Sequence, residues 1–351
     1  MAGPAAPARE LCVAINGWFL SRQNTGSGQY AAHLLACLGE QGIAASVAPP
    51  PDGGNVTKLL WEQLGWPRQA AASDAHLWHS PYFALPLRRS RPAVVTIHDL
   101  IPVLLPAYRG SLLARAYTWL QLLACRSAAA IVVDSDFSRR DVMRVLKVPP
   151  RRVRTVYLGV DDPDPPPRDE APPLEVPYVL YVGGLDVRKN VPLLIAAFGE
   201  IAEQFPRLVL AIVGAPRSSS ARFPDARRAA EPLGDRVRFL GWVSEEEKFR
   251  LYRHAALFAY PSLYEGFGLN PLEALARGCP VVCSNASSLP EVVGDAALLA
   301  DARQATPFAQ AMVAALRDPA PLRARGPAQA ARFTWRRCAE QTAQAYREAA
   351  A

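Results

Sequence analysis

Residues 257–285 read LFAYPSLYEGFGLNPLEALARGCPVVCSN and contain a complete strand–turn–helix–strand unit. The short apolar run 257–262 predicts a buried strand, 271–278 has the pattern of a helix, and 280–285 predicts a second buried strand. A helix that joins two buried strands is the connection that parallel strands require. This stretch therefore predicts a parallel α/β sheet.

The same alternation runs along the whole chain. Strand-like runs occur at 11–16, 44–49, 75–80, 92–98, 129–135, 153–159, 178–184, 208–214, 237–242, 257–262, 280–285 and 297–302. Helical patterns separate most of them, at 28–42, 112–127, 191–205, 244–255 and 271–278. We expect an α/β protein with two Rossmann-like domains whose parallel sheets face an interdomain cleft, because ligands of such sheets bind at the carboxyl ends of the strands.

A Pro-rich and acidic stretch lies near the middle of the chain. Residues 161–177 read DDPDPPPRDEAPPLEVP, which suits neither helix nor strand and predicts a linker. We therefore expect an N-terminal domain (1–161), a linker (162–177) and a C-terminal domain (178–330). The last segment, 331–351, has a helical pattern.

Composition restricts the class of protein. The 351 residues carry a net charge of +7, which favours an anionic partner, but the Lys and Arg residues are scattered and predict no nucleic-acid site. The six cysteines lie mostly in apolar runs and indicate free thiols in a reducing compartment. The first ten residues lack the apolar core of a signal peptide, so we expect a cytoplasmic protein.

The stretch 263–278 carries two acids, Glu265 and Glu273, and each allows more than one interpretation. Asn270 can cap the following helix and Glu273 can complete a capping box, which explains Glu273 without a ligand. That interpretation leaves Glu265 and the two glycines of the turn unexplained. Backbone amides at a helix N-terminus also attract anions and oxygen-rich ligands.

Other candidate residues follow predicted strands. His98 and Asp99 come directly after 92–97, and Arg188 and Lys189 follow the strand at 178–184, where they suit a diphosphate or form an exposed basic turn. Gly26 and Gly28 precede a helix without the full GxGxxG spacing, so they form either a simple tight turn or a phosphate-facing turn; in both cases we expect bare amides toward the cleft.

The segment DSD at 134–136 looks like a metal-binding DxD motif. Ser135 or Asp136 suits the alternative role of a helix cap, because a helical pattern follows directly.

Taken together, these segments resemble the family-4 glycosyltransferases of the two-domain GT-B fold. The similar segments are HSPYFALP, VVTIHDLIP, VDSDFSRRDV, YLGVD, YVGGLDVRKN, FLGWVSEEEKFRLYRHA and the long block 261–299. They run in the family's order from about residue 10 to the end of the chain. The resemblance also implies that the final helix, 331–351, crosses back to the N-terminal domain.

The resemblance implies roles for individual residues. Glu273 would hold the ribose of the nucleotide, Arg188 and Lys189 the diphosphate, and Glu265 the sugar hydroxyls, with His98 reaching the sugar and Asp99 on the acceptor side. Further donor contacts are expected at Gly184, Gly266, Phe267, Gly268 and Leu269. The base would lie near Trp242 and Val243, and the phosphate or acceptor side near Gly26 and Gly28.

The expected activity is transfer of a sugar from a nucleotide sugar to a glycan or lipid-linked acceptor, with retention of configuration. The segments HSPYF and HDLIP resemble mannosyltransferases of polysaccharide assembly, which suggests GDP-mannose. We expect no metal and no cofactor, since Arg188, Lys189 and helix amides can stabilise the leaving diphosphate. The alternatives are a nucleotide-sugar epimerase, an inactive partner subunit of the same fold and, third, a hydride-transferring dehydrogenase, against which the missing GxGxxG motif argues.

The segment 109–126 raises the question of a membrane. Arg109, Arg115 and Arg126 lie there among Leu, Tyr and Trp residues, which suits peripheral contact with an anionic inner membrane face. The alternative is a core helix with exposed arginines.

Overall fold

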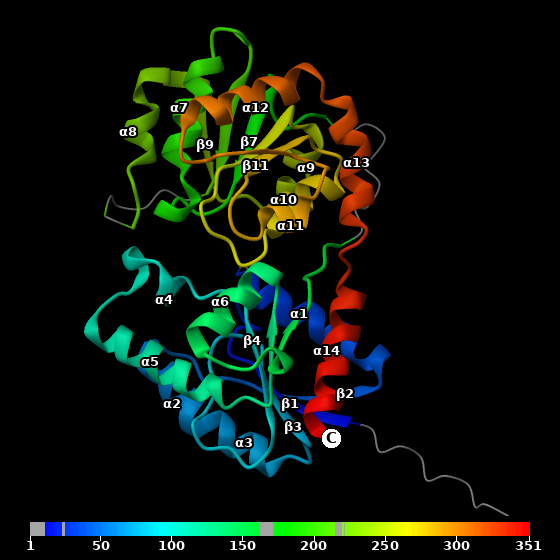
Figure 1. Cartoon of the computed structure of the whole chain (residues 1–351). Helices are drawn as coiled ribbons and strands as arrows, with labels where there is room; N and C mark the ends of the chain where they lie inside the picture. The colour runs from blue at the N-terminus through cyan, green and yellow to red at the C-terminus, as the bar shows by residue number, and fades with distance from the viewer. Residues whose placement is uncertain (1–10, 23–24, 162–170, 215–219, 221) are drawn as a thin grey trace, which may run out of the picture. The chain divides into compact units, whose positions relative to one another are not determined.

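The computed structural model describes residues 11–22, 25–161, 171–214, 220 and 222–351. Residues 1–10, where the sequence predicts no signal peptide, and residues 162–170 of the predicted linker lie outside this range. The chain divides into two compact units (Figure 1). Unit 1 consists of Met1–Leu100, Gly110–Gly159 and Trp335–Ala351, and unit 2 consists of Ile101–Arg109 and Val160–Thr334.

Unit 1 has a six-stranded parallel sheet. In sheet order its strands are β2 (Ile43–Ala48), β1 (Leu11–Asn16), β3 (Leu77–Ser80), β4 (Ala93–Ile97), β5 (Ala130–Val133) and β6 (Val153–Thr155). Every residue of β3, β4 and β5 is buried, as expected of central strands covered on both faces. The chain passes from β1 outward to β2 and then returns to β3 on the other side of β1. The carboxyl ends of β1 and β3 therefore flank a topological switch point.

Helices cover the sheet of unit 1. They are α1 (Gly26–Leu38), η1 (Gly39–Gln41), α2 (Asn55–Leu60), the π-helix η2 (Trp61–Gly65), α3 (Trp66–Ala72), α5 (Leu112–Arg126), α6 (Asp136–Leu146), η4 (Pro150–Arg152) and α14 (Trp335–Ala350).

The last helix, α14, packs on α1 and on β3, β4 and β5. A buried polar chain fixes it there: Tyr346 Oη bonds to His79 Nδ1 at 2.6 Å, and His79 Nε2 bonds to Thr96 Oγ1 at 3.0 Å. Burial lowers the pKa of His79 to about 3, so its imidazole is neutral at physiological pH.

Unit 2 has a second six-stranded parallel sheet. In sheet order its strands are β12 (Leu298–Ala300), β11 (Val281–Ser284), β10 (Leu257–Tyr260), β7 (Tyr178–Val182), β8 (Val209–Val213) and β9 (Val237–Gly241). Here the order reverses between β7 and β10. The carboxyl ends of β7 and β10 are thus the predicted place for a ligand.

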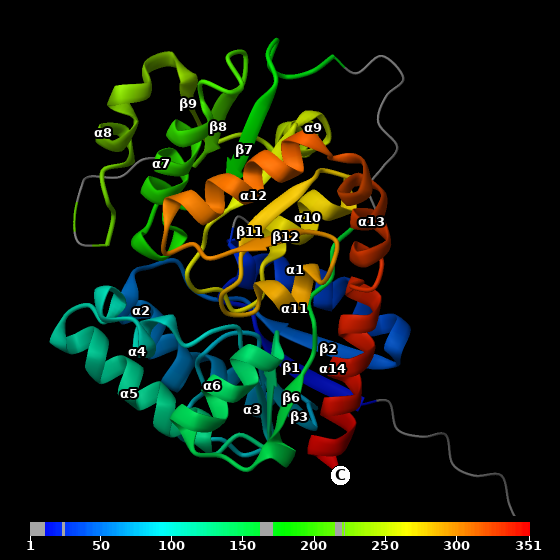
Figure 2. The same ribbon diagram turned by 45° about the horizontal axis from the view of Figure 1, so that its top comes forward.

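The helices of unit 2 are α4 (Ile101–Leu104), η3 (Pro106–Tyr108), η5 (Val187–Lys189), α7 (Val191–Ile201), α8 (Ala226–Ala230), η6 (Glu231–Arg236), α9 (Glu245–His254), α10 (Leu269–Ala276), α11 (Leu289–Val293), α12 (Ala305–Arg317) and α13 (Ala320–Ala330). In both views α12 lies across the face of the sheet (Figures 1 and 2).

The predicted fold class is confirmed. Each of the twelve strand-like runs overlaps one observed strand, and both sheets are parallel. The sequence patterns missed the helical segment 55–72 and the helices α4, α8, α11, α12 and α13.

Candidate active site

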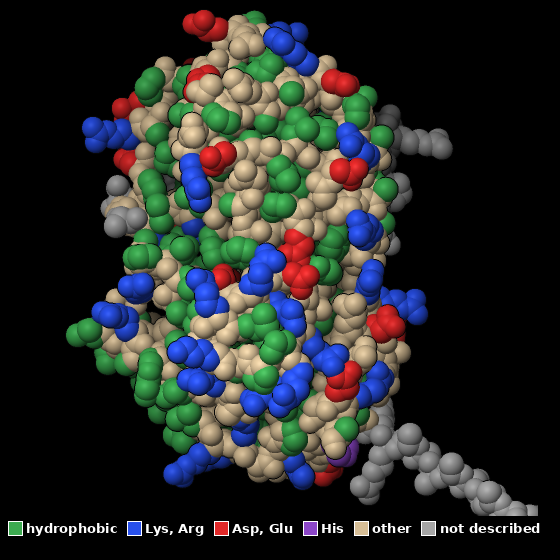
Figure 3. All heavy atoms as spheres, in the orientation of Figure 1, with side chains coloured by type: hydrophobic (Ala, Val, Ile, Leu, Met, Phe, Trp, Pro, Cys, Tyr) green, Lys and Arg blue, Asp and Glu red, His purple; other side chains and the backbone are tan. Residues whose placement is uncertain are grey.

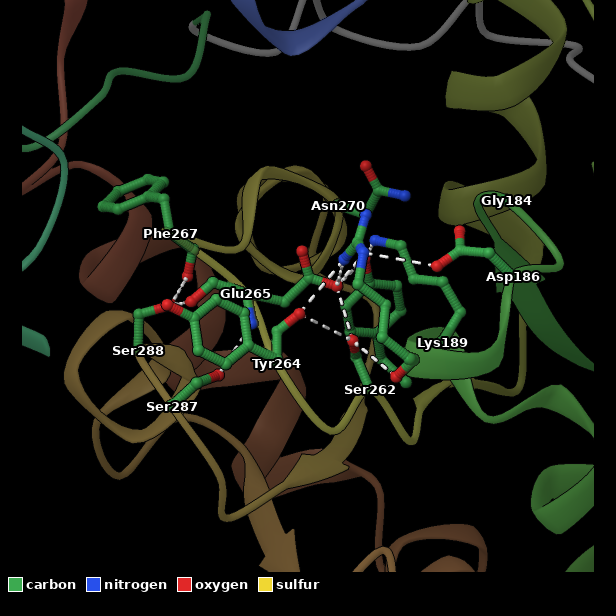
Figure 4. A network of polar contacts seen from close by, with 12 residues as sticks. Gly184, Asp186, Lys189, Ser262, Tyr264, Glu265, Phe267, Asn270, Ser287 and Ser288 are labelled. Atoms are coloured by element: carbon green, nitrogen blue, oxygen red, sulfur yellow. Dashed lines mark hydrogen bonds and ion pairs between the residues drawn. The ribbon is translucent and has the colours of Figure 1, made fainter. Parts of the chain in front are cut away.

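A closely connected polar cluster of unit 2 lies at its topological switch point. One loop leaves β7 at Gly183 and continues through Gly184 into η5, which carries Arg188 and Lys189. The other leaves β10 and runs through Ser262 to the start of α10. Figure 4 shows side chains from the two loops pointing toward one another. The two loops at the ends of β7 and β10 therefore bring together residues that are about 80 positions apart in the sequence.

Glu265 is the centre of this cluster. Its Oε1 forms an ion pair with Arg188 Nη1 at 2.9 Å and accepts a hydrogen bond from Lys189 Nζ at 2.6 Å. The same oxygen accepts from Ser262 Oγ at 2.6 Å and from Tyr260 Oη at 3.0 Å. Burial alone would raise the pKa of Glu265, but Arg188 and Lys189 lower it to about 2. Glu265 is therefore ionised, with one oxygen held by three hydrogen-bond donors and the ion pair with Arg188.

The second carboxylate oxygen of Glu265 is different. In the described part of the chain Oε2 has no hydrogen-bond partner, and Figure 4 draws contacts to only one oxygen of this side chain. Oε2 is not one of the buried side-chain atoms that lack a partner, so this oxygen is not fully buried. Oε2 is therefore an ionised acceptor that solvent reaches, held in place by the bonds to Oε1. Such an oxygen can accept a hydrogen bond from a ligand hydroxyl.

The two cations already have anionic partners. Arg188 Nε lies 3.3 Å from Asp186 Oδ1, in addition to its contact with Glu265. Lys189 is 7% exposed and also bonds Tyr260 Oη, so two of its three ammonium protons are used. The sequence predicted a basic pair for a diphosphate, but it did not predict that both cations share the carboxylate of Glu265.

Serines fix the turn between Glu265 and α10. Ser287 Oγ accepts from the backbone amide of Glu265 at 3.0 Å. Ser288 Oγ donates to the carbonyl oxygens of Glu265 at 3.0 Å and Phe267 at 2.5 Å. Gly268 has φ +122°, and a Cβ there would lie 2.8 Å from Leu289 Cδ2, so this position requires glycine. The turn that carries Gly266, Phe267, Gly268 and Leu269 is thus held from behind by the segment 287–289.

The capping-box interpretation of Glu273 is wrong. The helix begins at Leu269 with Gly268 as its N-cap, so Asn270 and Pro271 lie inside the first turn. Asn270 Nδ2 donates to the carbonyl of Val182 at 2.6 Å instead of capping. Glu273 is the fifth residue of the helix and cannot reach the cap. The cause is the positive φ of Gly268, which lets the helix start two residues earlier than the sequence suggested.

Glu273 contacts α9 instead. Its Oε1 accepts from Lys248 Nζ at 3.0 Å and its Oε2 accepts from Tyr252 Oη at 3.3 Å. Burial raises the pKa of Glu273, and Lys248 opposes that shift. Trp242, which follows β9, is 71% exposed, and Val243 is half-buried. Sequence reasoning missed Lys248, Tyr252, Asp186, Ser262, Ser287 and Ser288. For Asp186, Ser262, Ser287 and Ser288, which follow the strands β7, β10 and β11, the strand-end rule was an available signal.

In unit 1, His98 follows β4 as predicted. Its Nδ1 lies 2.7 Å from Asp134 Oδ2 and its Nε2 lies 3.2 Å from the carbonyl oxygen of Pro81. A carbonyl oxygen only accepts, so both ring nitrogens donate when both bonds form, and the ring is then an imidazolium. Burial would lower the pKa of His98, but Asp134 outweighs it and raises the pKa. Asp99 is half-buried beside it.

The expectation of bare amides at Gly26 and Gly28 is wrong for Gly28. Both glycines lie in the first turn of α1, and Gly28 N donates to Oγ1 of Thr25, the N-cap, at 3.2 Å. A Cβ on Gly28 would lie 2.1 Å from the carbonyl oxygen of Arg22, so close packing of the preceding loop explains this glycine.

The DSD segment acts as a helix cap, as the alternative interpretation predicted. Ser135 is the N-cap of α6 and its Oγ accepts from Ser138 N at 3.0 Å. Asp134 bonds His98, and Asp136 Oδ1 accepts from Thr155 Oγ1 at 2.5 Å. Within the described residues, no three His, Cys, Asp or Glu side chains are grouped as metal ligands. None of the helices described combines the length and apolar character that a membrane span requires.

Comparisons with known proteins agree with this geometry. Residues 24–163 match the family model "Glycosyltransferase Family 4", and residues 166–332 match "Glycosyl transferases group 1". The chain is 36% identical to the O-antigen chain mannosyltransferase B of Escherichia coli over 287 residues, which cover 78% of this chain and 74% of that protein.

Two solved structures resemble the fold. Sucrose-phosphate synthase of Thermosynechococcus elongatus gives a TM-score of 0.71 at 23% identity, and the matched region covers 96% of this chain and 98% of the synthase chain. Anabaena HepE in complex with UDP and glucose gives a TM-score of 0.68 at 16% identity, with 95% and 98% covered.

The fold and the switch-point site together define a glycosyltransferase of the GT-B class. The chain belongs to the family-4 glycosyltransferases.

Proposed function

We propose that this protein transfers mannose from GDP-mannose to a glycan or lipid-linked acceptor, with retention of configuration and without a metal. The observation that carries the proposal is Glu265, whose Oε1 is fixed by Arg188 and Lys189 while Oε2 is open. This arrangement offers cations for a diphosphate directly beside an acceptor for sugar hydroxyls. The mannosyltransferase among the relatives supports mannose, and the UDP-bound state of HepE supports a nucleotide sugar.

The residue roles follow from the charges. Arg188 and Lys189 would stabilise the negative charge that develops on the departing diphosphate, and Lys189 retains one ammonium proton for it. Oε2 of Glu265 would accept a hydrogen bond from a sugar hydroxyl as the sugar gains oxocarbenium character. Glu273 would hold the ribose. Its carboxylate would then accept hydrogen bonds from the ribose hydroxyls in addition to those from Lys248 and Tyr252.

The remaining roles stay predictions. Trp242 and Val243 would lie near the base, and the amides of the turn at Gly266–Leu269 near the sugar. His98 and Asp99 are predicted for the sugar and the acceptor. For a metal-independent reaction the support is chemical: Arg188 and Lys189 supply positive charge, and the DSD acids already have protein partners.

The test is a comparison of nucleotide sugars by thermal unfolding, followed by product analysis. A bound donor at 100 times its Kd adds about 2.7 kcal/mol of stability. We expect GDP-mannose and GDP to raise Tm more than UDP or ADP donors, and the α-linked product to retain the donor's configuration by NMR. Stabilisation by another nucleotide sugar alone would reject the mannose donor but keep the transferase. Donor isomerisation without transfer would indicate the epimerase instead.

A further inference from the structure

Exposed apolar side chains are concentrated in one region of unit 1. In the described residues twelve large hydrophobic side chains are exposed, and eight of them lie between positions 56 and 123. They are Val56, Leu60, Leu64, Leu87, Leu112, Leu113, Trp119 and Leu123. Scattered apolar residues need no explanation, but a concentration of this kind marks an interaction surface.

Helix α5 carries an exposed apolar row opposite its buried face. The buried face contains Gln121, Ala124 and Cys125. Trp119 is 62% exposed and Leu112 is 80% exposed. The exposed row follows the spacing of one helical face, with intervals of four, three and four residues, and consists of Leu112, Ala116, Trp119 and Leu123. An apolar row on the outer side of a helix that is already packed indicates contact with something outside the described chain.

A neighbouring helical segment extends this surface. On α2 and η2, Val56, Leu60 and Leu64 are spaced four residues apart and are 72%, 54% and 48% exposed. A buried polar cluster joins this segment to α5: Tyr117 Oη donates to Glu62 Oε2 at 2.7 Å and accepts from Lys58 Nζ at 2.7 Å. Gln121 Nε2 adds a bond to Glu62 at 3.3 Å. The exposed rows on the two segments are thus held together as one preformed surface, which we call the α2–α5 surface.

Charge on the α5 side of this surface is almost entirely positive. From residue 75 to residue 133 the sequence has six arginines, no lysine and a single acid, Asp99. Arg115 and Arg126 are exposed on α5. Arg89 Nη2 bonds Ser127 Oγ at 2.7 Å, which places the loop that carries the exposed Arg88 and Arg91 at the end of the same helix. Figure 3 shows hydrophobic side chains together with Lys and Arg at the left edge of unit 1, where α5 lies in Figure 1.

We propose that the α2–α5 surface docks on an anionic lipid bilayer, with Trp119 and its neighbouring leucines in the interfacial layer and the arginines against the headgroups. An exposed apolar face flanked by arginines and carrying a tryptophan is the pattern of a helix that lies in the membrane interface. A second copy of the chain fits less well, because a two-fold contact through this face would bring like charges together. The docking is independent of which sugar the enzyme transfers.

The experiment is co-sedimentation of the full chain with vesicles. One set is an equal mixture of phosphatidylglycerol and phosphatidylcholine, and the other is phosphatidylcholine alone, each at low and high salt. We expect binding to the anionic vesicles only, weakened by salt. The double substitution Trp119→Gln with Leu123→Gln should lower the partition coefficient at least about tenfold. Arg115→Gln with Arg126→Gln should lower it several-fold and flatten the salt dependence.

Controls separate docking from damage to the fold. Leu299→Gln removes a 40% exposed leucine on β12, outside the surface, and should bind as the unaltered chain does. All variants should keep the same turnover on a soluble acceptor. Of the seven tryptophans, Trp119 and Trp242 are exposed. Brominated lipid should therefore quench the tryptophan fluorescence of the unaltered chain. In Trp119→Phe most of this quenching should be lost.

Three outcomes would overturn the proposal. Equal binding to neutral and anionic vesicles would remove the role of the arginines. If neither kind of vesicle is bound although all variants are folded, a lipid bilayer is not the partner of the α2–α5 surface. A concentration-dependent dimer that Trp119→Gln with Leu123→Gln converts to monomer would assign the α2–α5 surface to a second copy.

Discussion

Replacing Glu265 by Gln tests the central claim about the active site. The substitution keeps one acceptor oxygen for Ser262 and Tyr260 but removes the charge that lies 2.9 Å from Arg188 Nη1 and 2.6 Å from Lys189 Nζ. Loss of one partner from a buried ion pair costs about 3 to 5 kcal/mol, and the retained oxygen argues for the lower end. For a domain of this size about 3 kcal/mol lowers Tm by roughly 6 to 12 °C.

Ligand binding should change in the opposite direction. In Glu265→Gln, Arg188 would keep only Asp186 as an anionic partner and Lys189 would lose its carboxylate, so both cations would bind a nucleoside diphosphate with less competition. We expect affinity for the nucleoside diphosphate equal to that of the unaltered enzyme or higher, by up to about tenfold. Turnover should fall by roughly 10²- to 10³-fold, because Oε2 no longer offers a negative acceptor to the sugar.

The assay combines thermal unfolding, calorimetry and turnover. The unaltered chain should also lose stability as the pH falls from 4.5 to about 2, since the folded-state pKa of Glu265 lies below its ordinary value of 4.5. Glu265→Gln should lack that component. Weaker binding of the nucleoside diphosphate to Glu265→Gln would refute the reasoning, because it would show that the carboxylate supports the diphosphate instead of competing with it.

Three further predictions concern neighbouring groups. Glu273→Gln should weaken nucleoside diphosphate binding by roughly 1.5 to 3 kcal/mol by calorimetry, and unchanged affinity would remove Glu273 from the ribose. Transfer should continue at full rate in excess chelator; loss of activity that manganese restores would contradict this. Asp134→Asn should lower the pKa of His98, followed by NMR titration. The pKa of His98 is raised in the fold, so its protonation stabilises the unaltered chain below about pH 6.5, and this contribution is lost as the pH rises through the raised value. An unshifted titration would mean that Asp134 does not hold the imidazolium.

The strands were readable from the sequence because each is a short, continuous apolar run, as central parallel strands require. The segment 55–72 was not, because Gly65 and Pro67 interrupt its helical pattern. In the structure the π-helix η2 carries the chain through this point, and a Cβ on Gly65 would lie 2.7 Å from Trp61 Cε3. Local propensity therefore argued against a helix that tertiary packing supports.

The site was predictable in position but not in pairing. The strand-end rule placed Glu265, Arg188 and Lys189 at ligand-facing loops, and the structure brings all three together. Arg188 and Lys189 both contact the same oxygen of Glu265. This pairing depends on the conformations of the two loops, which no local sequence pattern encodes. The capping box failed for a related reason, since the backbone angle of Gly268 decides where α10 begins.

The position of α14 has a consequence for how the chain is made. Unit 1 includes Trp335–Ala351, yet the 175 residues from Val160 to Thr334 belong to unit 2 and are synthesised in between. At the usual speed of translation that interval is roughly 9 to 35 s. Throughout it the nascent strands β3, β4 and β5 lack the helix that covers them, and His79 lacks Tyr346. The ribosome therefore completes the second unit before the first, and a chain interrupted before residue 335 presents chaperones with an uncovered sheet.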